Sequence, residues 1–324
     1  MRAVVYDSYG PPESLRVEDV ATPSPTADQV LLRVHATSIN LSDWECLRGT
    51  PLYARIGGLR TPARPTLGSD VAGVVEAVGS GVSRFRVGDE VYGDNLDLKG
   101  GFAECAVAPE SALALKPPEL TFAEASTIPQ AGAIAMRGTD GVRAGQRLLI
   151  NGAGGGSGSF AIQLATGADA HVTGVDNAGK LDFMRSLGAD EVIDYESEDF
   201  TRTGGRYDLV LDLVAHRSVV ACRRALAPGG RYGCVGGPVR TLVAMATIGP
   251  IVGRLTRRRM GVLVVRQGPA HFGPLADLCV AGDVAIHVDR TFGLDEVAEA
   301  LRYVGEGRAR GKVVVTPDGS SSTR

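Results

Sequence analysis

The feature that most constrains this 324-residue chain is a run of glycines at residues 152–158, Gly-Ala-Gly-Gly-Gly-Ser-Gly. A buried-strand pattern, Gln146–Asn151, leads into the run, and the segment after it, Ser159–Thr166, has the apolar spacing of a helix. A strand, a glycine turn and a helix N-terminus together offer backbone N–H groups and a positive dipole end to a phosphate. The loop is therefore expected to bind a pyrophosphate.

The register that best fits is Ala153-x-Gly155-x-x-Gly158, a dinucleotide fingerprint with Ala in the place of the first glycine. Asp176 ends the next strand about 20 residues later, where a carboxylate accepts hydrogen bonds from the adenosine ribose hydroxyls. A helix N-cap is the alternative role for Asp176, and a loop without a ligand is the alternative for the motif. The cofactor-binding residues predicted here are Ala153, Gly154, Gly155, Gly156, Ser157, Gly158, Asp176 and Lys180.

The choice between NADH and NADPH stays open, with a slight preference for NADH. A carboxylate at Asp176 would repel a 2′-phosphate, whereas Lys180, close behind it, would neutralise one. Further cofactor contacts are expected where later strands of the same sheet end, at Tyr195, Val214 and Gly236.

Two regions of different character divide the chain. Residues 1–118 read as short β runs separated by turns. From Thr121, which forms a predicted capping box with Glu124, strands and helices alternate, and this pattern predicts a parallel sheet. The last strand, Lys312–Thr316, is expected to return to the first region, and the Ser/Gly-rich tail 317–324 is expected to be disordered.

Composition excludes several classes of protein. The net charge of −3 gives no reason to expect nucleic acid or a membrane as partner, and a small-molecule partner is expected instead. The longest apolar stretch, Leu242–Leu255, is too short to span a bilayer. Five scattered cysteines without CxxC spacing argue against disulfides and a cysteine-built zinc site, and favour a cytoplasmic location.

Further motifs run over nearly the whole chain: GSDVAGVV at 68–75, VGDEVYG at 87–93, GFAE at 101–104, LGAD at 187–190, IDY at 193–195 and GRARGKVVV at 307–315. With the glycine loop, they resemble the medium-chain dehydrogenase/reductase superfamily, in particular its zinc-free quinone oxidoreductase branch. The resemblance implies an α/β protein with a doubly wound Rossmann sheet and a GroES-like, β-rich catalytic domain. The catalytic domain is expected at 1–118 and 266–324, and the Rossmann domain at 119–265.

The positions that hold zinc in the metal-dependent branch differ here. Asn40 stands in the place of a cysteine ligand, Ser69 in the place of a histidine, and the third ligand would fall near Gln130-Ala131. Amides and hydroxyls are poor zinc ligands beside thiolate and imidazole, so no metal is expected. Asp70 is expected to bind backbone or a basic neighbour in a structural role.

Without a Lewis acid, hydride addition to an enone or quinone is easier than alcohol oxidation, because hydrogen-bond donors suffice for the charge that develops on the carbonyl oxygen. By position in the family, the expected catalytic residues are Asn40, Ser42 and Tyr53, with Lys312 near the cofactor between the domains. Each catalytic candidate has an alternative role: Asn40 holds its loop, Ser42 caps a helix starting at Asp43, or Tyr53 packs.

Three functions remain open at this point. They are an NAD(P)H-dependent reductase of quinones or enones, which we favour, a zinc-free alcohol or aldehyde dehydrogenase, and a dinucleotide-binding protein without turnover. A homodimer is expected, as is frequent in the family, with Met260–Val265 as the interface. The helix-like segment 239–255 and the run Arg257-Arg258-Arg259 match no chemistry named so far. One interpretation is that they cover the substrate cleft, and the alternative, which is favoured for the arginines, is a solvated face.

Overall fold

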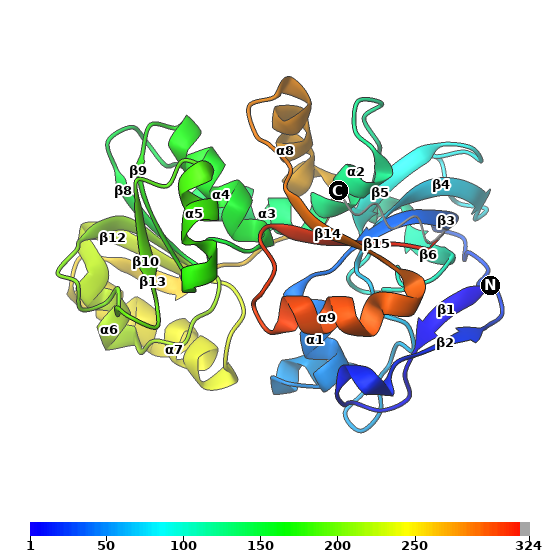
Figure 1. Cartoon of the computed structure of the whole chain (residues 1–324), viewed down its shortest axis with the longest axis horizontal. Helices are drawn as coiled ribbons and strands as arrows, with labels where there is room; N and C mark the ends of the chain where they lie inside the picture. Colours follow the sequence, from blue (N-terminus) through cyan, green and yellow to red (C-terminus); the bar gives the residue numbers. More distant parts are fainter. Residues whose placement is uncertain (318–324) are drawn as a thin grey trace. The chain divides into compact units, whose positions relative to one another are not determined.

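The computed structural model describes residues 1–317, and these form two compact units (Figure 1). Unit 1 holds Met1–Ala133, Arg266–Gly282 and the residues from Ile286 onward, and unit 2 holds Ile134–Val265 with Asp283–Ala285. The division near residue 133 lies 15 residues beyond the one expected at 118/119, because α2 (Phe122–Thr127) packs on strands of unit 1. The tail expected to be disordered lies outside the described residues, apart from Pro317.

Unit 1 is built on a seven-stranded sheet of order β14-β15-β3-β4-β5-β7, with β6 also paired to β3. All its pairs are antiparallel except β14 with β15, so the last strand does return to the first region. Its strands are β3 (Gln29–Ser38), β4 (Asp70–Val78), β5 (Glu90–Asp94), β6 (Cys105–Pro109), β7 (Leu113–Leu115), β14 (Val288–Gly293) and β15 (Lys312–Thr316). A separate hairpin-like pair joins β1 (Arg2–Val5) to β2 (Arg16–Asp19).

Alternating apolar residues explain why β3 and β4 form the centre of this sheet. Val30 and Leu32 of β3 point to the same side and pack with Val71 and Val75 of β4 in one buried cluster. The helices of the unit are α1 (Leu41–Arg48), α2, α3 (Pro129–Thr139, which crosses into unit 2), α8 (Pro269–Ala281) and α9 (Val297–Gly305). Short 3₁₀ turns lie at Pro12–Ser14, Leu52–Arg55, Glu110–Ala112 and Leu294–Glu296.

Unit 2 is a six-stranded, all-parallel sheet of order β10-β9-β8-β11-β12-β13. In chain order this is 3-2-1-4-5-6, the doubly wound arrangement, so the connection reverses direction between β8 and β11. The strands are β8 (Arg147–Asn151), β9 (His171–Asp176), β10 (Glu191–Asp194), β11 (Tyr207–Asp212), β12 (Leu226–Cys234) and β13 (Arg259–Val262). The helices are α4 (Gly156–Gly167), α5 (Leu181–Ser186), α6 (Val219–Ala225) and α7 (Val239–Leu255), with a 3₁₀ turn at Ala178–Lys180.

The reversal point fixes where unit 2 can bind a ligand. The carboxyl ends of β8 and β11 lie side by side, with Asn151 paired to Asp212 in register and joined to it by a 2.8 Å side-chain hydrogen bond. In open α/β sheets the crevice for a ligand lies at this edge, next to the reversal. The glycine loop leaves β8 there.

Local signals in the sequence match the structure closely. The predicted capping box is present, since Glu124 N–H donates to Thr121 Oγ1 and Thr121 N–H donates to the Glu124 carboxylate. The predicted last strand has the bounds of β15. No helix among the described residues is long and apolar enough to cross a membrane.

Candidate active site

The glycine loop runs from the end of β8 to the first turn of α4. Gly152 has a φ of +87°, so the left-handed conformation that favours glycine falls there, one residue before Ala153. This explains how alanine is tolerated in the fingerprint's first position. Gly155 is the N-cap of α4 and has no side chain to cap it, so the N–H groups of the first turn remain available to an anion.

Two further glycines of the loop are required by close approach. A Cβ on Gly158 would lie 2.3 Å from Gly152 O, so only glycine lets α4 pack this closely on the loop. A Cβ on Gly154 would lie 2.6 Å from the Lys180 side chain and 3.1 Å from an Asp176 oxygen. The fingerprint's last glycine therefore has the packing role that the motif predicts.

Asp176 ends β9 directly beside the loop. Its carboxylate accepts a 3.0 Å hydrogen bond from Gly154 N–H and another from Asn177 N–H, and it forms a 3.3 Å ion pair with Lys180. Lys180 is 5% exposed, so its ammonium group is committed to this carboxylate. The N-cap of the 3₁₀ turn that follows is Asn177, so the alternative of Asp176 as N-cap is wrong.

The other residues predicted near the cofactor in unit 2 gather at the same edge. Tyr195 is half-exposed, and its N–H donates to Asp176 O. Val214 lies against Gly152, within 3.1 Å of the position a Cβ there would take. Gly236, with a φ of +73°, follows the end of β12, and a Cβ on the adjacent Gly237 would lie 2.7 Å from Val214 O.

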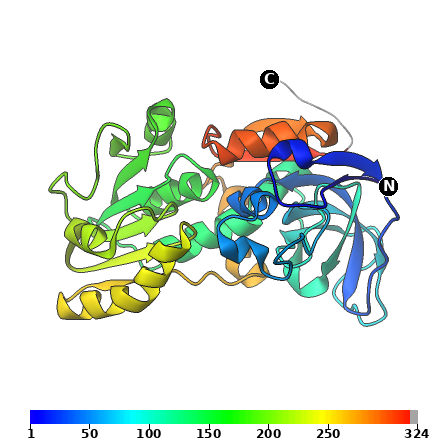
Figure 2. The same cartoon turned by 90° about the horizontal axis from the view of Figure 1, so that it is seen from below.

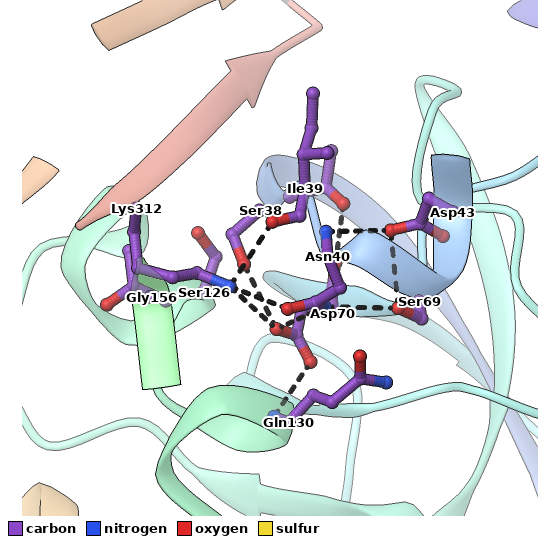
Figure 3. Close-up of polar contacts among 12 residues, drawn as sticks. Ser38, Ile39, Asn40, Asp43, Ser69, Asp70, Ser126, Gln130, Gly156 and Lys312 are labelled. Atoms are coloured by element: carbon purple, nitrogen blue, oxygen red, sulfur yellow. Dashed lines mark hydrogen bonds and ion pairs between the residues drawn. The ribbon is translucent and has the colours of Figure 1, made fainter. Parts of the chain in front are cut away.

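In unit 1, a buried polar network joins Asn40, Asp43, Ser69, Asp70 and Lys312 (Figure 3). Asn40 is the N-cap of α1, and its backbone N–H donates a 3.0 Å hydrogen bond to the Asp43 carboxylate. Lys312 comes from β15 and donates to Asn40 Oδ1 at 2.7 Å. Its Nζ also lies 3.6 Å from Asp70, so Asp70 has the basic neighbour that was expected for it.

All hydrogen-bonding groups of the Asn40 amide are occupied within this network. Nδ2 donates to Ser69 Oγ at 3.2 Å and to Asp70 Oδ2 at 2.8 Å, while Oδ1 accepts from Lys312. An amide nitrogen has two hydrogens, so Asn40 has none left for a substrate oxygen. The donor role predicted for Asn40 therefore needs one of these bonds to break.

Ser42 has a different role from its predicted alternative. The helix begins at Leu41 with Asn40 as its cap, so the expectation that Ser42 caps a helix starting at Asp43 is wrong. Ser42 Oγ instead donates to Gln130 Oε1 at 3.0 Å, and Gln130 N–H donates to Asp70 at 3.1 Å. Within residues 1–317, Gln130 Nε2 has no hydrogen-bond partner, so the pair presents an oriented amide donor.

Gln130 was not among the site residues expected from the sequence. The available signal was its place near the expected third metal-ligand position, and the structure joins it to Ser42 and Asp70. A side-chain amide offers a donor where a metal would offer positive charge.

Tyr53 lies in the 3₁₀ turn Leu52–Arg55, and its hydroxyl donates to Glu45 Oε1 at 2.9 Å. Burial raises the pKa of Glu45, and the hydrogen bond from Tyr53 opposes that rise. The two groups could pass a proton, which leaves both predicted roles of Tyr53 open.

Burial also controls the charges of the polar network. It raises the pKa of Asp70, and the ammonium group of Lys312 opposes that rise. Asp94, paired with Asp70 in register across β4 and β5, has its pKa raised to about 8 by burial and by the nearby charge of Asp70. Over residues 1–317, no group of three or more His, Cys, Asp or Glu side chains could hold a metal ion.

Comparison with known proteins places this chain. Residues 26–118 match the family described as "Alcohol dehydrogenase GroES-like domain", and residues 187–315 match "Zinc-binding dehydrogenase". The chain is 33% identical to 2-methylene-furan-3-one reductase of Solanum lycopersicum, over 98% of the chain and 79% of that protein. It is 32% identical to the chloroplast envelope quinone oxidoreductase homolog of Arabidopsis thaliana, over 98% of both.

Among solved structures, the quinone oxidoreductase from Coxiella burnetii is similar with a TM-score of 0.87 and 29% identity, over 98% of this chain and 99% of that one. The fold and these relatives define an oxidoreductase of the medium-chain dehydrogenase/reductase class. Within it, the chain belongs to the quinone oxidoreductase-like branch.

Proposed function

We propose that this protein reduces quinones or α,β-unsaturated carbonyl compounds with NAD(P)H. The observation that carries the proposal is the glycine loop at the reversal point of the unit 2 sheet, where Gly155 leaves the first turn of α4 uncapped and Gly154 contacts Asp176. Pyrophosphate fits this loop because its backbone N–H groups and the helix dipole favour an anion. The predicted residues of the loop, with Asp176, Tyr195, Val214 and Gly236, would hold the dinucleotide.

When bound, the reduced nicotinamide supplies a hydride to the β-carbon of the enone or to the quinone ring. The protein's part is to stabilise the negative charge that appears on the carbonyl oxygen. We assign this to Gln130 Nε2, oriented by the hydroxyl of Ser42, and assign proton delivery to Tyr53 with Glu45 behind it. Asn40 and Lys312 act as positioning residues, since their polar groups are bonded to each other and to Asp70. A contact between Lys312 and the cofactor stays a prediction.

Within this proposal, NADH is the preferred cofactor. The Lys180 ammonium group is buried against Asp176, so it is not free to pair with a 2′-phosphate. A 2′-phosphate beside Asp176 would face a carboxylate that already accepts hydrogen bonds from the N–H groups of Gly154 and Asn177. The ribose hydroxyls of NADH would meet an acceptor instead.

Two weaker expectations also belong to the proposal. The cysteines among the described residues are free, which suits a reducing compartment such as the cytoplasm. β13 is an edge strand, so its exposed backbone groups suit the homodimer expected from the sequence.

The test is an assay of turnover in metal-free buffer, in which the loss of NADH or NADPH absorbance measures the rate. A panel of quinones and enones is expected to be reduced, and simple alcohols offered with the oxidised cofactor are not. Oxidation of alcohols alone would favour the dehydrogenase alternative. Cofactor binding by calorimetry without turnover on any substrate would favour a non-catalytic protein, and no binding of either nucleotide would overturn the proposal.

A further inference from the structure

The outward face of α7 is unusually apolar for a helix on the surface of unit 2. The helix lies at the periphery of that unit, coloured yellow in Figure 2. Val243 is 55% exposed, Ile248 50%, Ile251 61% and Leu255 79%. Ile248, Ile251 and Leu255 are spaced three and four residues apart, so they form one row along the helix. Contiguous exposed apolar residues of this kind mark an interaction surface.

The packing of unit 2 does not use this face. The buried residues of α7 are Thr241, Met245, Gly249 and Gly253, on its other side. A Cβ on Gly253 would lie 2.8 Å from Arg258 O and one on Gly249 3.2 Å from Met260 O, so glycines bring the helix close to β13. The exposed row therefore needs an explanation outside the fold of the unit.

The same segment carries only positive charge. Residues 239–259 contain five arginines, Arg240, Arg254, Arg257, Arg258 and Arg259, and no acidic residue, in a chain whose net charge is −3. Arg258 donates to the backbone oxygens of Leu226 and Thr256. In the described part of the chain, none of the other four arginines forms an ion pair with a carboxylate.

We propose that α7 and the arginines that follow it form a docking surface for an anionic lipid membrane. A helix with an exposed apolar face and flanking arginines lies in the plane of the bilayer interface, with its aliphatic side chains among the acyl chains and its guanidinium groups at the phosphates. At 17 residues the helix lies on the membrane and does not cross it. The net charge of the whole chain gave no reason to expect a membrane partner, but this one segment is both basic and apolar.

Two other occupants fit this surface less well. A second copy seated on the exposed row of α7 by a twofold axis would bring its own Arg240 and Arg254 against these, and like charges oppose such contact. The homodimer proposed above is a different contact, made by the edge backbone of β13. Nucleic acid would satisfy the arginines but would leave four exposed aliphatic side chains without an apolar partner. An anionic bilayer satisfies both kinds of side chain at once.

The experiment is flotation of the full-length protein with vesicles of phosphatidylcholine alone or of an equimolar mixture with phosphatidylglycerol. Binding is expected to the mixed vesicles, with little to the neutral ones, and to fall as salt is raised. The charge variant Arg240→Gln/Arg254→Gln/Arg257→Gln is expected to lower the partition coefficient about 100-fold. The apolar variant Ile248→Ser/Ile251→Ser/Leu255→Ser is expected to lower it at least about tenfold.

Matched controls separate this surface from general stickiness. Val87→Ser/Leu115→Ser removes exposed apolar side chains of unit 1, and Arg86→Gln/Arg202→Gln removes exposed charges elsewhere. Both controls are expected to bind like the parent protein, and all variants should keep its thermal midpoint. Equal binding by the α7 variants, or no binding of the parent to mixed vesicles, overturns the proposal. A change of oligomeric state in the apolar variant, seen by sedimentation without any vesicle binding, assigns the face to a second copy and also overturns it.

Discussion

Lys312 Nζ lies 2.7 Å from Asn40 Oδ1, a contact between β15 and the start of α1 that spans 272 positions of sequence. The same ammonium group lies 3.6 Å from Asp70, and all three residues are buried. The contact fixes which way the Asn40 amide points and sets the charge balance of the network.

Lys312→Met is expected to destabilise the protein by about 3 kcal/mol, because it leaves the Asp70 carboxylate buried without its cation. The free energy of urea unfolding measures the loss. Adding Asp70→Asn removes the uncompensated charge, so the double variant should recover much of it. An unfolding midpoint for Lys312→Met equal to that of the parent would contradict the assignment.

Gly158→Ala places a methyl group 2.3 Å from Gly152 O, so α4 must shift away from the loop. We expect a loss of about 2 kcal/mol in stability and at least about tenfold weaker cofactor binding, measured by denaturation and calorimetry. Gly167→Ala is the control at the other end of the same helix, where nothing lies within 4 Å of the added methyl. It should be neutral or stabilise by up to about 1 kcal/mol.

Asp176→Ser removes the carboxylate that would repel a 2′-phosphate and releases Lys180 from its ion pair. The ratio of kcat/KM for NADPH to that for NADH is expected to rise at least about tenfold. Loss of the Gly154 contact affects both cofactors, so the ratio is the informative quantity. Asp182→Ser, an exposed acid on α5 paired only with Arg185 among the charges of the described chain, should leave the ratio unchanged.

Gln130→Met is expected to lower kcat about 100-fold with little change in KM, because the amide is assigned to charge present only in the transition state. Ser42→Ala should lower kcat about tenfold, and Ser42→Thr should restore much of it by keeping the hydroxyl that orients Gln130. Ser14→Ala, which removes an exposed hydroxyl bonded to Pro11 O, serves as control. A rise in KM with unchanged kcat in these variants would instead assign Gln130 and Ser42 to substrate binding.

Asp94→Asn tests the protonation of the network through pH. Folded Asp94 keeps its proton up to about pH 8, whereas the ordinary value is 3.8, so the folded state binds more protons between those values. The free energy of unfolding contributed by this group therefore falls as pH rises through that window, by about 1 kcal/mol per pH unit. Asp94→Asn should flatten this slope and raise the thermal midpoint at pH 8 relative to the parent, with little effect near pH 4. An unchanged slope would show that Asp94 is ionised throughout.

Several features of the site could be predicted because they depend on neighbouring residues. The glycine loop, its strand and its helix lie within about one supersecondary unit, and the packing role of Gly158 follows from the motif. The ends of β9, β10, β11 and β12 could be placed at one edge because parallel strands share it. Asp176 could be assigned to that edge from the sequence. The sequence could not show that Lys180 is paired with Asp176, as it is in the structure, and not free to meet a phosphate.

The catalytic assignments depended on partners distant in sequence. Asn40 was expected to offer its amide to a substrate, but Ser69, Asp70 and Lys312 occupy every group of it. Ser42 was expected to cap a helix or act directly, and its partner Gln130 lies 88 positions away. Hydrogen-bond satisfaction is a property of all the groups around a side chain, so residue type alone does not decide which donors remain unused.

By itself the sequence determined the class of fold, the order of its strands and helices, and the loop that suits a pyrophosphate, because hydrophobic period and glycine placement act over a few residues. Only the tertiary structure decided which polar groups are free, which charges are buried together, and which face of α7 is left exposed. Those properties depend on which distant segments of the same unit fill the space beside each side chain, and that is settled only when the unit folds.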